Sequence, residues 1–141
     1  MRRIFIGLVV CLSFAACNFP ANMWIKLTPE EKSYLDRAMA QPLTFTVKSE
    51  DSNRLWGMAQ AFIGKYASMK IESASDYVIE TYNPVESRFG YRVIRTPKKD
   101  GDEFTITCLY TAFLVKDAEQ NAHIFAHYLL TEELIERLIR R

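Results

Sequence analysis

The sequence predicts an α+β fold in which a curved antiparallel sheet packs on a central helix and a C-terminal helix. Residues 51–67 have the strongest helical periodicity in the chain, and residues 121–141 have a second helical pattern. Between them, residues 69–115 contain short apolar or alternating stretches separated by turn signals, which are typical of antiparallel strands. Such a sheet must bury one face, and the two amphipathic helices are able to cover it.

The first expected element is a helix over residues 28–39. Thr28 is a favourable N-cap, Pro29 suits the first helical position, and Glu31 completes a capping box. We expect the helix to end before Pro42, because proline disfavours helical backbone in the residue that precedes it.

Residues 43–48 alternate between apolar and polar side chains, which predicts a strand that buries Leu43, Phe45 and Val47. The helix over 51–67 follows, and a polar residue near its start is expected to cap it, namely Ser49, Asp51 or Ser52. The apolar residues at helical spacing on this helix are Leu55, Trp56, Ala59, Phe62, Ile63 and Tyr66.

Gly57, Ala61 and Gly64 form a stripe of small residues on the same helix. Glycine inside a helix costs roughly 1 kcal/mol relative to alanine, so the stripe calls for an explanation. We expect it to allow close approach of the helix to the sheet or to a second helix. A groove left open for a ligand or partner is the alternative.

Two hairpins are predicted next. Strands at 69–73 and 76–82 are joined by a tight turn near Ala74 and Ser75 or by a bulge, and strands at 89–96 and 103–115 flank Asp100–Gly101, a strong hairpin signal. Centring the turn on Asp100–Gly101 pairs Val93 with Cys108 and Tyr91 with Tyr110. Because proline has no N–H, we expect the loop to open at Pro97 and pairing to begin near Thr96 and Thr105.

A turn that begins at Lys116 leads to the last predicted helix, 121–141, with a break near Leu130 where Thr131 resembles a new N-cap. The element order is similar to that of helix-grip and cystatin-like folds, and a ferredoxin-like sandwich is the alternative.

With 141 residues, 49% of them hydrophobic and 25% charged, one domain is expected. A net charge of +1 without a basic block argues against binding nucleic acid.

The N-terminus has the layout of a secretory signal. Arg2 and Arg3 precede an apolar run, Ile4–Ala16, which is shorter than the roughly 20 residues that span a membrane. We therefore expect residues 1–16 to be removed and to take no part in the fold.

The residues Phe14-Ala15-Ala16-Cys17 resemble the lipobox of bacterial lipoproteins. The resemblance covers residues 1–17 only and departs from the family pattern at Phe14, where an aliphatic residue is usual. It implies that the Cys17 sulfur receives diacylglycerol, that a further acyl group such as palmitate is added, and that Cys17 becomes the mature N-terminus. The alternative is cleavage after Ala15 by an ordinary signal peptidase, which would leave Cys17 unmodified.

An anchor of two or more acyl chains holds a protein stably on a membrane. The resemblance, with Asn18 rather than aspartate after the cysteine, implies the outer membrane, facing the periplasm. Residues 17–27 are then the lipidated N-terminus and tether, and 28–141 form the single domain. Cys11 would leave with the signal, so Cys108 is expected to be a buried thiol without a disulfide partner.

Candidate catalytic groups are few. His123 and His127 are spaced for a metal pair on a helix, but the segment lacks the glutamate of HExxH, and we interpret both as partly exposed structural histidines. Asp76 and Glu80 lie about 13 Å apart on a strand, too far for joint acid–base work. The sequence therefore predicts neither an enzyme, nor a metal site, nor a cofactor.

The leading hypothesis is a non-enzymatic envelope protein that binds another envelope component or itself. Its motivation is the lipid anchor together with the absence of catalytic constellations. A further lead is an apolar face of the final hairpin, formed by Ile94, Leu109, Phe113 and Val115, which the N-terminal helix, the C-terminal helix or a partner must cover. The alternative is a small-molecule or lipid-binding module with a pocket between the sheet and the helix over 51–67, lined by Trp56, Phe62 and Tyr66.

Overall fold

The computed structural model describes residues 26–111 and 114–141. The expectations for the signal sequence, for Cys17, for most of the tether and for Phe113 concern residues outside these ranges. In chain order the elements are α1 Pro29–Met39, β1 Thr44–Val47, α2 Ser49–Tyr66, β2 Ile71–Ala74, β3 Val78–Thr81, β4 Gly90–Lys98, β5 Gly101–Leu109, α3 Val115–Thr131 and the short 3-10 helix Glu136–Leu138.

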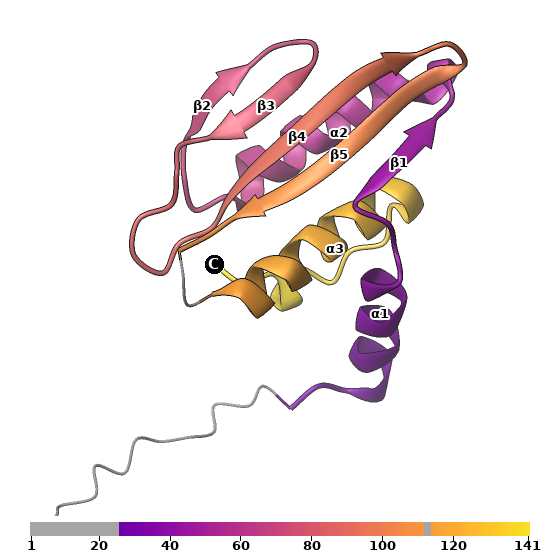
Figure 1. Cartoon of the computed structure of the whole chain (residues 1–141). Coiled ribbons are helices and arrows are strands. Elements are labelled where there is room, and N and C mark those ends of the chain that lie inside the picture. Colours follow the sequence, from indigo (N-terminus) through magenta and orange to yellow (C-terminus); the bar gives the residue numbers. More distant parts are fainter. Residues whose placement is uncertain (1–25, 112–113) are drawn as a thin grey trace, which may run out of the picture.

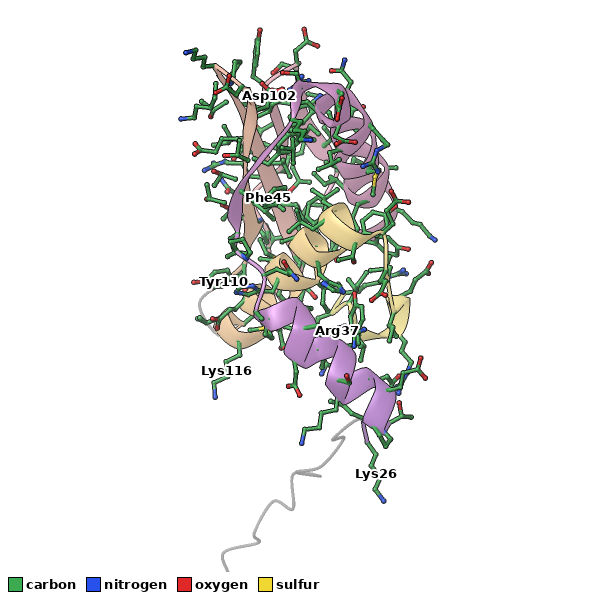
Figure 2. The ribbon with its side chains drawn as sticks, turned by 90° about the vertical axis from the view of Figure 1, so that its right-hand side faces the viewer. Lys26, Arg37, Phe45, Asp102, Tyr110 and Lys116 are labelled. Atoms are coloured by element: carbon green, nitrogen blue, oxygen red, sulfur yellow. The ribbon has the colours of Figure 1, made fainter. Side chains whose placement is uncertain are left out.

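The strands form one antiparallel sheet in the order β1-β5-β4-β3-β2. Figure 1 shows the long β4–β5 hairpin crossing the molecule, with α2 and α3 against the sheet and α1 packed on α3. In Figure 2 the sheet is seen nearly edge-on, and the helices lie on one side of it. The predicted α+β class is thus confirmed. Because β2 to β5 follow one another without a helix between them, the ferredoxin-like alternative does not apply.

The core lies between the helices and the inner face of the sheet. Phe62 of α2 stacks on Phe125 of α3 with ring centroids 4.0 Å apart, and Tyr91 of β4 meets both rings edge-on. The other fully buried side chains of the sheet include Ile79, Val93 and Phe104. Aromatic stacking across three elements therefore fixes how α2 and α3 sit on the sheet.

The first helix begins as the sequence predicts. The Thr28 hydroxyl accepts a hydrogen bond from the Glu31 N–H, and the Glu31 carboxylate accepts one from the Thr28 N–H at 2.8 Å. The predicted caps of α2 are wrong, because Lys48 takes the cap position without a side-chain bond. Ser52 is instead buried and donates to the carboxylate of Asp102.

The register of the β4–β5 hairpin differs from the prediction by two residues. Lys98 pairs with Gly101, so the turn is Lys99–Asp100, and Tyr91 lies opposite Cys108 instead of Tyr110. Pairing also continues through Pro97, which lies opposite Asp102. The physical reason is that backbone N–H groups along a strand alternate in direction. Arg95 N–H points toward β3 and donates to Tyr77 O, so the nitrogen of Pro97, two residues later, also points to that side. Pro97 lies beyond the residues that pair with β3, so its missing N–H costs the sheet no hydrogen bond.

Gly101 is the first residue of β5 and not part of the turn. Its φ of +150° is one that residues with side chains rarely adopt, and a Cβ there would lie 1.9 Å from the backbone oxygen of Val47. Glycine is therefore required where β5 begins against the end of β1. By contrast, a Cβ at Gly57 or Gly64 would meet nothing within 4 Å. The expectation that the small-residue stripe allows close packing is wrong, since the stripe faces outward from α2.

β2 and β3 form the predicted hairpin, with both a turn and a bulge. The Ser75 hydroxyl accepts hydrogen bonds from the N–H groups of Tyr77 and Val78, and the register shifts between Ile71 and Ser73.

The predicted last strand and last helix both need correction. β5 ends at Leu109, and α3 begins at Val115. The turn expected to begin at Lys116 is therefore part of a helix. The predicted break near Leu130 is confirmed, because Glu132 adopts the left-handed conformation with φ 63°.

The chain after this break does not resume an α-helix. It folds back along α3, where the Asn121 amide donates to Arg140 O and its oxygen accepts from Arg140 N–H, both at 2.9 Å. Leu138 and Ile139 are buried there. The C-terminal segment is therefore part of the core.

Candidate binding groove

A groove lies between the C-terminal half of β5 and the N-terminal half of α3. Its volume is about 420 Å³, and its walls are mainly apolar. The residues that line it are Leu43, Ile106, Thr107, Cys108, Tyr110, Val115, Ala118, Glu119 and Ala122. In Figure 2 the labels of Tyr110 and Lys116 lie one above the other at the lower left, where β5 stops and α3 starts.

The groove exists because β1 is shorter than β5. β1 pairs with Asp102–Thr105 only, and the last backbone bond between them runs from Ile106 N–H to Leu43 O at 2.9 Å. Before Leu43 the chain turns away into α1, and Gln41 O is bonded to the ring of His123 at 2.9 Å. The end of β5 is therefore left without a neighbour on this side among the strands that the structure describes.

The backbone of Cys108 faces this open edge. Residues of a strand alternate in the direction of their N–H and C=O groups, and Ile106 directs its N–H toward β1. Cys108, two residues later, directs its N–H and C=O the same way, where β1 has already ended. The groove thus combines an apolar wall with a donor and an acceptor of the main chain.

The walls differ in polarity along their length. Ala118 and Ala122 of α3 are buried and form the floor with Ile106, whereas Val115 at the mouth is 50% exposed. Glu119 is the one charged residue among the lining residues, and it is exposed. An apolar cavity with few polar groups is the usual composition of a binding site.

The Cys108 thiol is buried, as the sequence predicts, with 5% of the residue exposed. Burial raises the pKa of this thiol to about 12.

In the chain that starts at residue 17 with Cys17→Ser, we therefore expect iodoacetamide at pH 8 to alkylate Cys108 at least about a hundredfold more slowly in the folded protein than in urea, since the thiolate is the nucleophile. Mass spectrometry of timed samples measures both rates. Equal rates would show that Cys108 is accessible in the folded chain.

The three residues predicted to bind a ligand do not line this groove. Trp56 packs against Phe104, with ring centroids 6.0 Å apart, and Phe62 and Tyr66 contact each other at 4.8 Å. Edges of Phe62 and Tyr66 reach a second hollow of about 290 Å³, which lies between α2 and the C-terminal segment and is also lined by Lys65 and Glu136. Ligand binding by Trp56, Phe62 and Tyr66 stays a prediction.

The histidines have different environments from those expected. His127 is buried rather than partly exposed, and its ring meets Tyr34 edge-on at 5.1 Å. Its Nε2 atom lies 3.5 Å from a carboxylate oxygen of Glu133, while the Nδ1 atom of His123 bonds to Gln41 O. The two rings therefore have separate partners. Within residues 26–111 and 114–141, no cluster of three or more His, Cys, Asp or Glu side chains is placed to hold a metal ion.

The carboxylates of β3 and its turn are also apart. Glu80 is paired with the guanidinium of Arg92 on the outer face of the sheet, with Nε 2.8 Å from the carboxylate, and Asp76 is exposed in the turn before β3.

The apolar outer face of the final hairpin has fewer described members than predicted. Ile94 is 37% exposed on the outer face of the sheet, and Leu109 is half-buried. Val115 does not belong to this face, because it is the first residue of α3.

Sequence reasoning missed the roles of Leu43, Val115 and Glu119 at the groove. The sequence did indicate that the strand at 43–48 is shorter than the last strand of the final hairpin. This difference in length points to a groove only once it is known that the two strands pair. No helix in the described part of the chain has the length and apolar character needed to cross a membrane.

Three comparisons with known proteins give the same result. The chain matches no protein-family description, no curated protein and no solved structure.

Proposed function

We propose that this chain is a lipid-anchored, non-enzymatic protein of the bacterial envelope, and that its domain binds another envelope component or a second copy of itself at the groove between β5 and α3. The observation that carries the binding role is the end of β5 beyond its pairing with β1, which lies beside an apolar cavity of about 420 Å³. Anchoring is supported by the residues Ala15-Ala16-Cys17 after an apolar run. The anchor would place the groove at a membrane surface.

Anchoring is tested by the intact mass and the location of the protein in the bacterium. We expect the wild-type chain to begin at Cys17, to be heavier by a diacylglyceryl and an acyl group, and to stay with the membrane fraction. Cys17→Ser removes the thiol that forms the thioether, so we expect that variant in the soluble fraction. A wild-type chain that begins at Ala16 without lipid would contradict the anchor.

Binding at the groove is tested by photo-crosslinking in living cells. p-Benzoyl-phenylalanine replaces Val115, which lines the mouth of the groove, or Gln60, which is exposed on α2 and serves as the matched control. We expect adducts to an envelope component, or to a second copy, from position 115 and not from position 60. Equal adduct formation at the two positions, or none at position 115, would argue against the groove as the binding site.

The second candidate function is binding of a small apolar molecule or lipid. The observation that favours it is the size of the groove, which falls within the range of about 300–1,000 Å³ found for ligand sites. Native mass spectrometry of the purified chain would then show a copurified ligand of defined mass, and Val115→Arg would remove it. A protein that carries no ligand in either form would rule this candidate out.

A further inference from the structure

We propose that the binding partner contributes an extended polypeptide segment, which adds to the sheet in line with β1 and pairs with the backbone of Cys108. This inference rests on the proposed function, because it names the chemistry of the partner at the same groove. The feature that carries it is the backbone of Cys108, which lies beyond the pairing of β1 with β5 and beside an apolar groove with a helix on the other side.

The backbone geometry favours a strand over other occupants. β1 pairs with β5 as far as the bond from Ile106 N–H to Leu43 O, so neighbouring strands are already correctly spaced at the point where β1 stops. The next groups of β5 on this side are the N–H and C=O of Cys108, which need an acceptor and a donor at the spacing of a polypeptide backbone. Small apolar molecules offer neither, whereas an added strand supplies both.

The groove selects the side chains of the segment. Successive side chains of a strand point to opposite faces, so every second side chain of the added segment would enter the groove between β5 and α3. There it would meet Ile106, Ala118 and Ala122, all of them buried and apolar. The segment should therefore have large apolar residues at alternate positions.

Charge favours a basic residue next to the apolar ones. Glu119 is exposed at the rim, and it is the one charged residue among those that line the groove. Lysine or arginine on the segment would meet this carboxylate, while an acidic residue would be repelled.

The experiment uses a phage-displayed library of random eight-residue peptides as the probe. The target is the chain that starts at residue 17 with Cys17→Ser, which contains every described element, and the same chain with Val115→Arg is used for counter-selection. Selected peptides are synthesised with a single N-methyl group at each position in turn. We expect N-methylation to weaken binding about tenfold at the one position whose N–H pairs with Cys108 O and less than about twofold at its two neighbours, because that N–H contributes roughly one hydrogen bond.

Two further readouts separate strand pairing from simple apolar binding. We expect bound peptide to slow hydrogen exchange at the Cys108 amide. We also expect Glu119→Lys to weaken basic peptides about fivefold and to be rescued when the peptide lysine becomes glutamate, whereas Lys116→Glu, a charge reversal on the same helix outside the groove lining, changes affinity less than about twofold.

The inference is overturned if the library yields no peptide that prefers the wild-type groove over Val115→Arg. It is also overturned if N-methylation at no single position stands out from its neighbours, or if decanoate fills the groove and excludes the peptides without slowing exchange at Cys108. None of these measurements needs the anchor. Crosslinks from position 115 in cells combined with failure of the peptides would leave the proposed function standing and reject only the strand.

Discussion

Replacing Phe62 with alanine is expected to lower the free energy of unfolding by about 4 kcal/mol. The residue is 2% exposed, and its ring stacks on Phe125 at 4.0 Å while meeting Tyr91 edge-on at 5.6 Å. Truncation removes the centre of this aromatic cluster and leaves a cavity between three elements that cannot all close on it. Since small domains have about 5–15 kcal/mol of stability, the variant should be close to unfolding.

Urea denaturation followed by circular dichroism measures this loss. Phe62→Leu keeps most of the buried volume, and we expect it to cost less than half as much. Gln60→Ala lies on the exposed side of the same helix and should change the free energy of unfolding by less than about 0.5 kcal/mol. A loss of under about 1 kcal/mol for Phe62→Ala would mean that the ring stack does not hold α2 and α3 together.

The second large effect is expected at Asp102, at the opposite end of the molecule from the groove (Figure 2). Its carboxylate accepts hydrogen bonds from the Ser52 hydroxyl and from Arg95 Nε, the latter at 2.6 Å, and so ties the start of α2 to β4 and β5. The Asp102 and Arg95 side chains are only 12% and 17% exposed. Asp102→Asn would leave the guanidinium without its counter-charge, and we expect a loss of about 2 kcal/mol at pH 7.

The loss should depend on pH in a defined direction. The hydrogen bond from Ser52, and then the hydrogen bond and charge of Arg95, hold the pKa of the Asp102 carboxyl below its usual value of 3.8. A depressed pKa means that the carboxylate adds stability above the pKa of the unfolded chain and that this contribution disappears as the pH falls through the folded-state pKa. The difference between wild type and Asp102→Asn should therefore be constant from about pH 5 to 8 and narrow below about pH 4.

Glu103 provides the matched control for this prediction. It is the next residue of β5 and pairs with Lys98 at 3.3 Å, but the two side chains are 34% and 48% exposed. We expect Glu103→Gln to cost less than about 1 kcal/mol at pH 7, because solvent already screens an exposed ion pair. Equal losses for the two variants would mean that Asp102 is not a buried link.

The elements defined by local signals were predictable from the sequence. The capping box of Thr28 and Glu31 fixes the start of α1, and the alternation around Phe45 fixes which face of β1 is buried. The register of β4 and β5 was not predictable from the same kind of signal, because Asp100–Gly101 marks a turn without saying which residue begins the ladder. Gly101 is required by the nearby backbone of Val47, which is distant in sequence.

The groove could not be predicted, because it depends on where three separate elements end. β1 must begin no earlier than Thr44, β5 must run past that residue to Leu109, and α3 must begin by Val115. The sequence indicated a longer last strand and a later helix, and these two errors together hid the cavity. The burial of Cys108 was predictable, since a small apolar residue inside an alternating strand is ordinarily part of the core.

The C-terminal segment shows how tertiary contacts override a local helix signal. Thr131 followed by two glutamates is typical of a helix start, yet the chain folds back after Glu132 and is held by the side chain of Asn121. A buried amide paired with the backbone of Arg140 supplies the same two hydrogen bonds that a neighbouring strand would supply. Nothing in residues 131–141 alone indicates this partner.

The position of these last residues has a consequence for the order in which the protein matures. Leu138 and Ile139 are buried in the core although they follow α3 in sequence. Until these two residues have been made and have left the ribosome, α3 lacks part of its packing, so the native core closes only once this segment has folded back along α3.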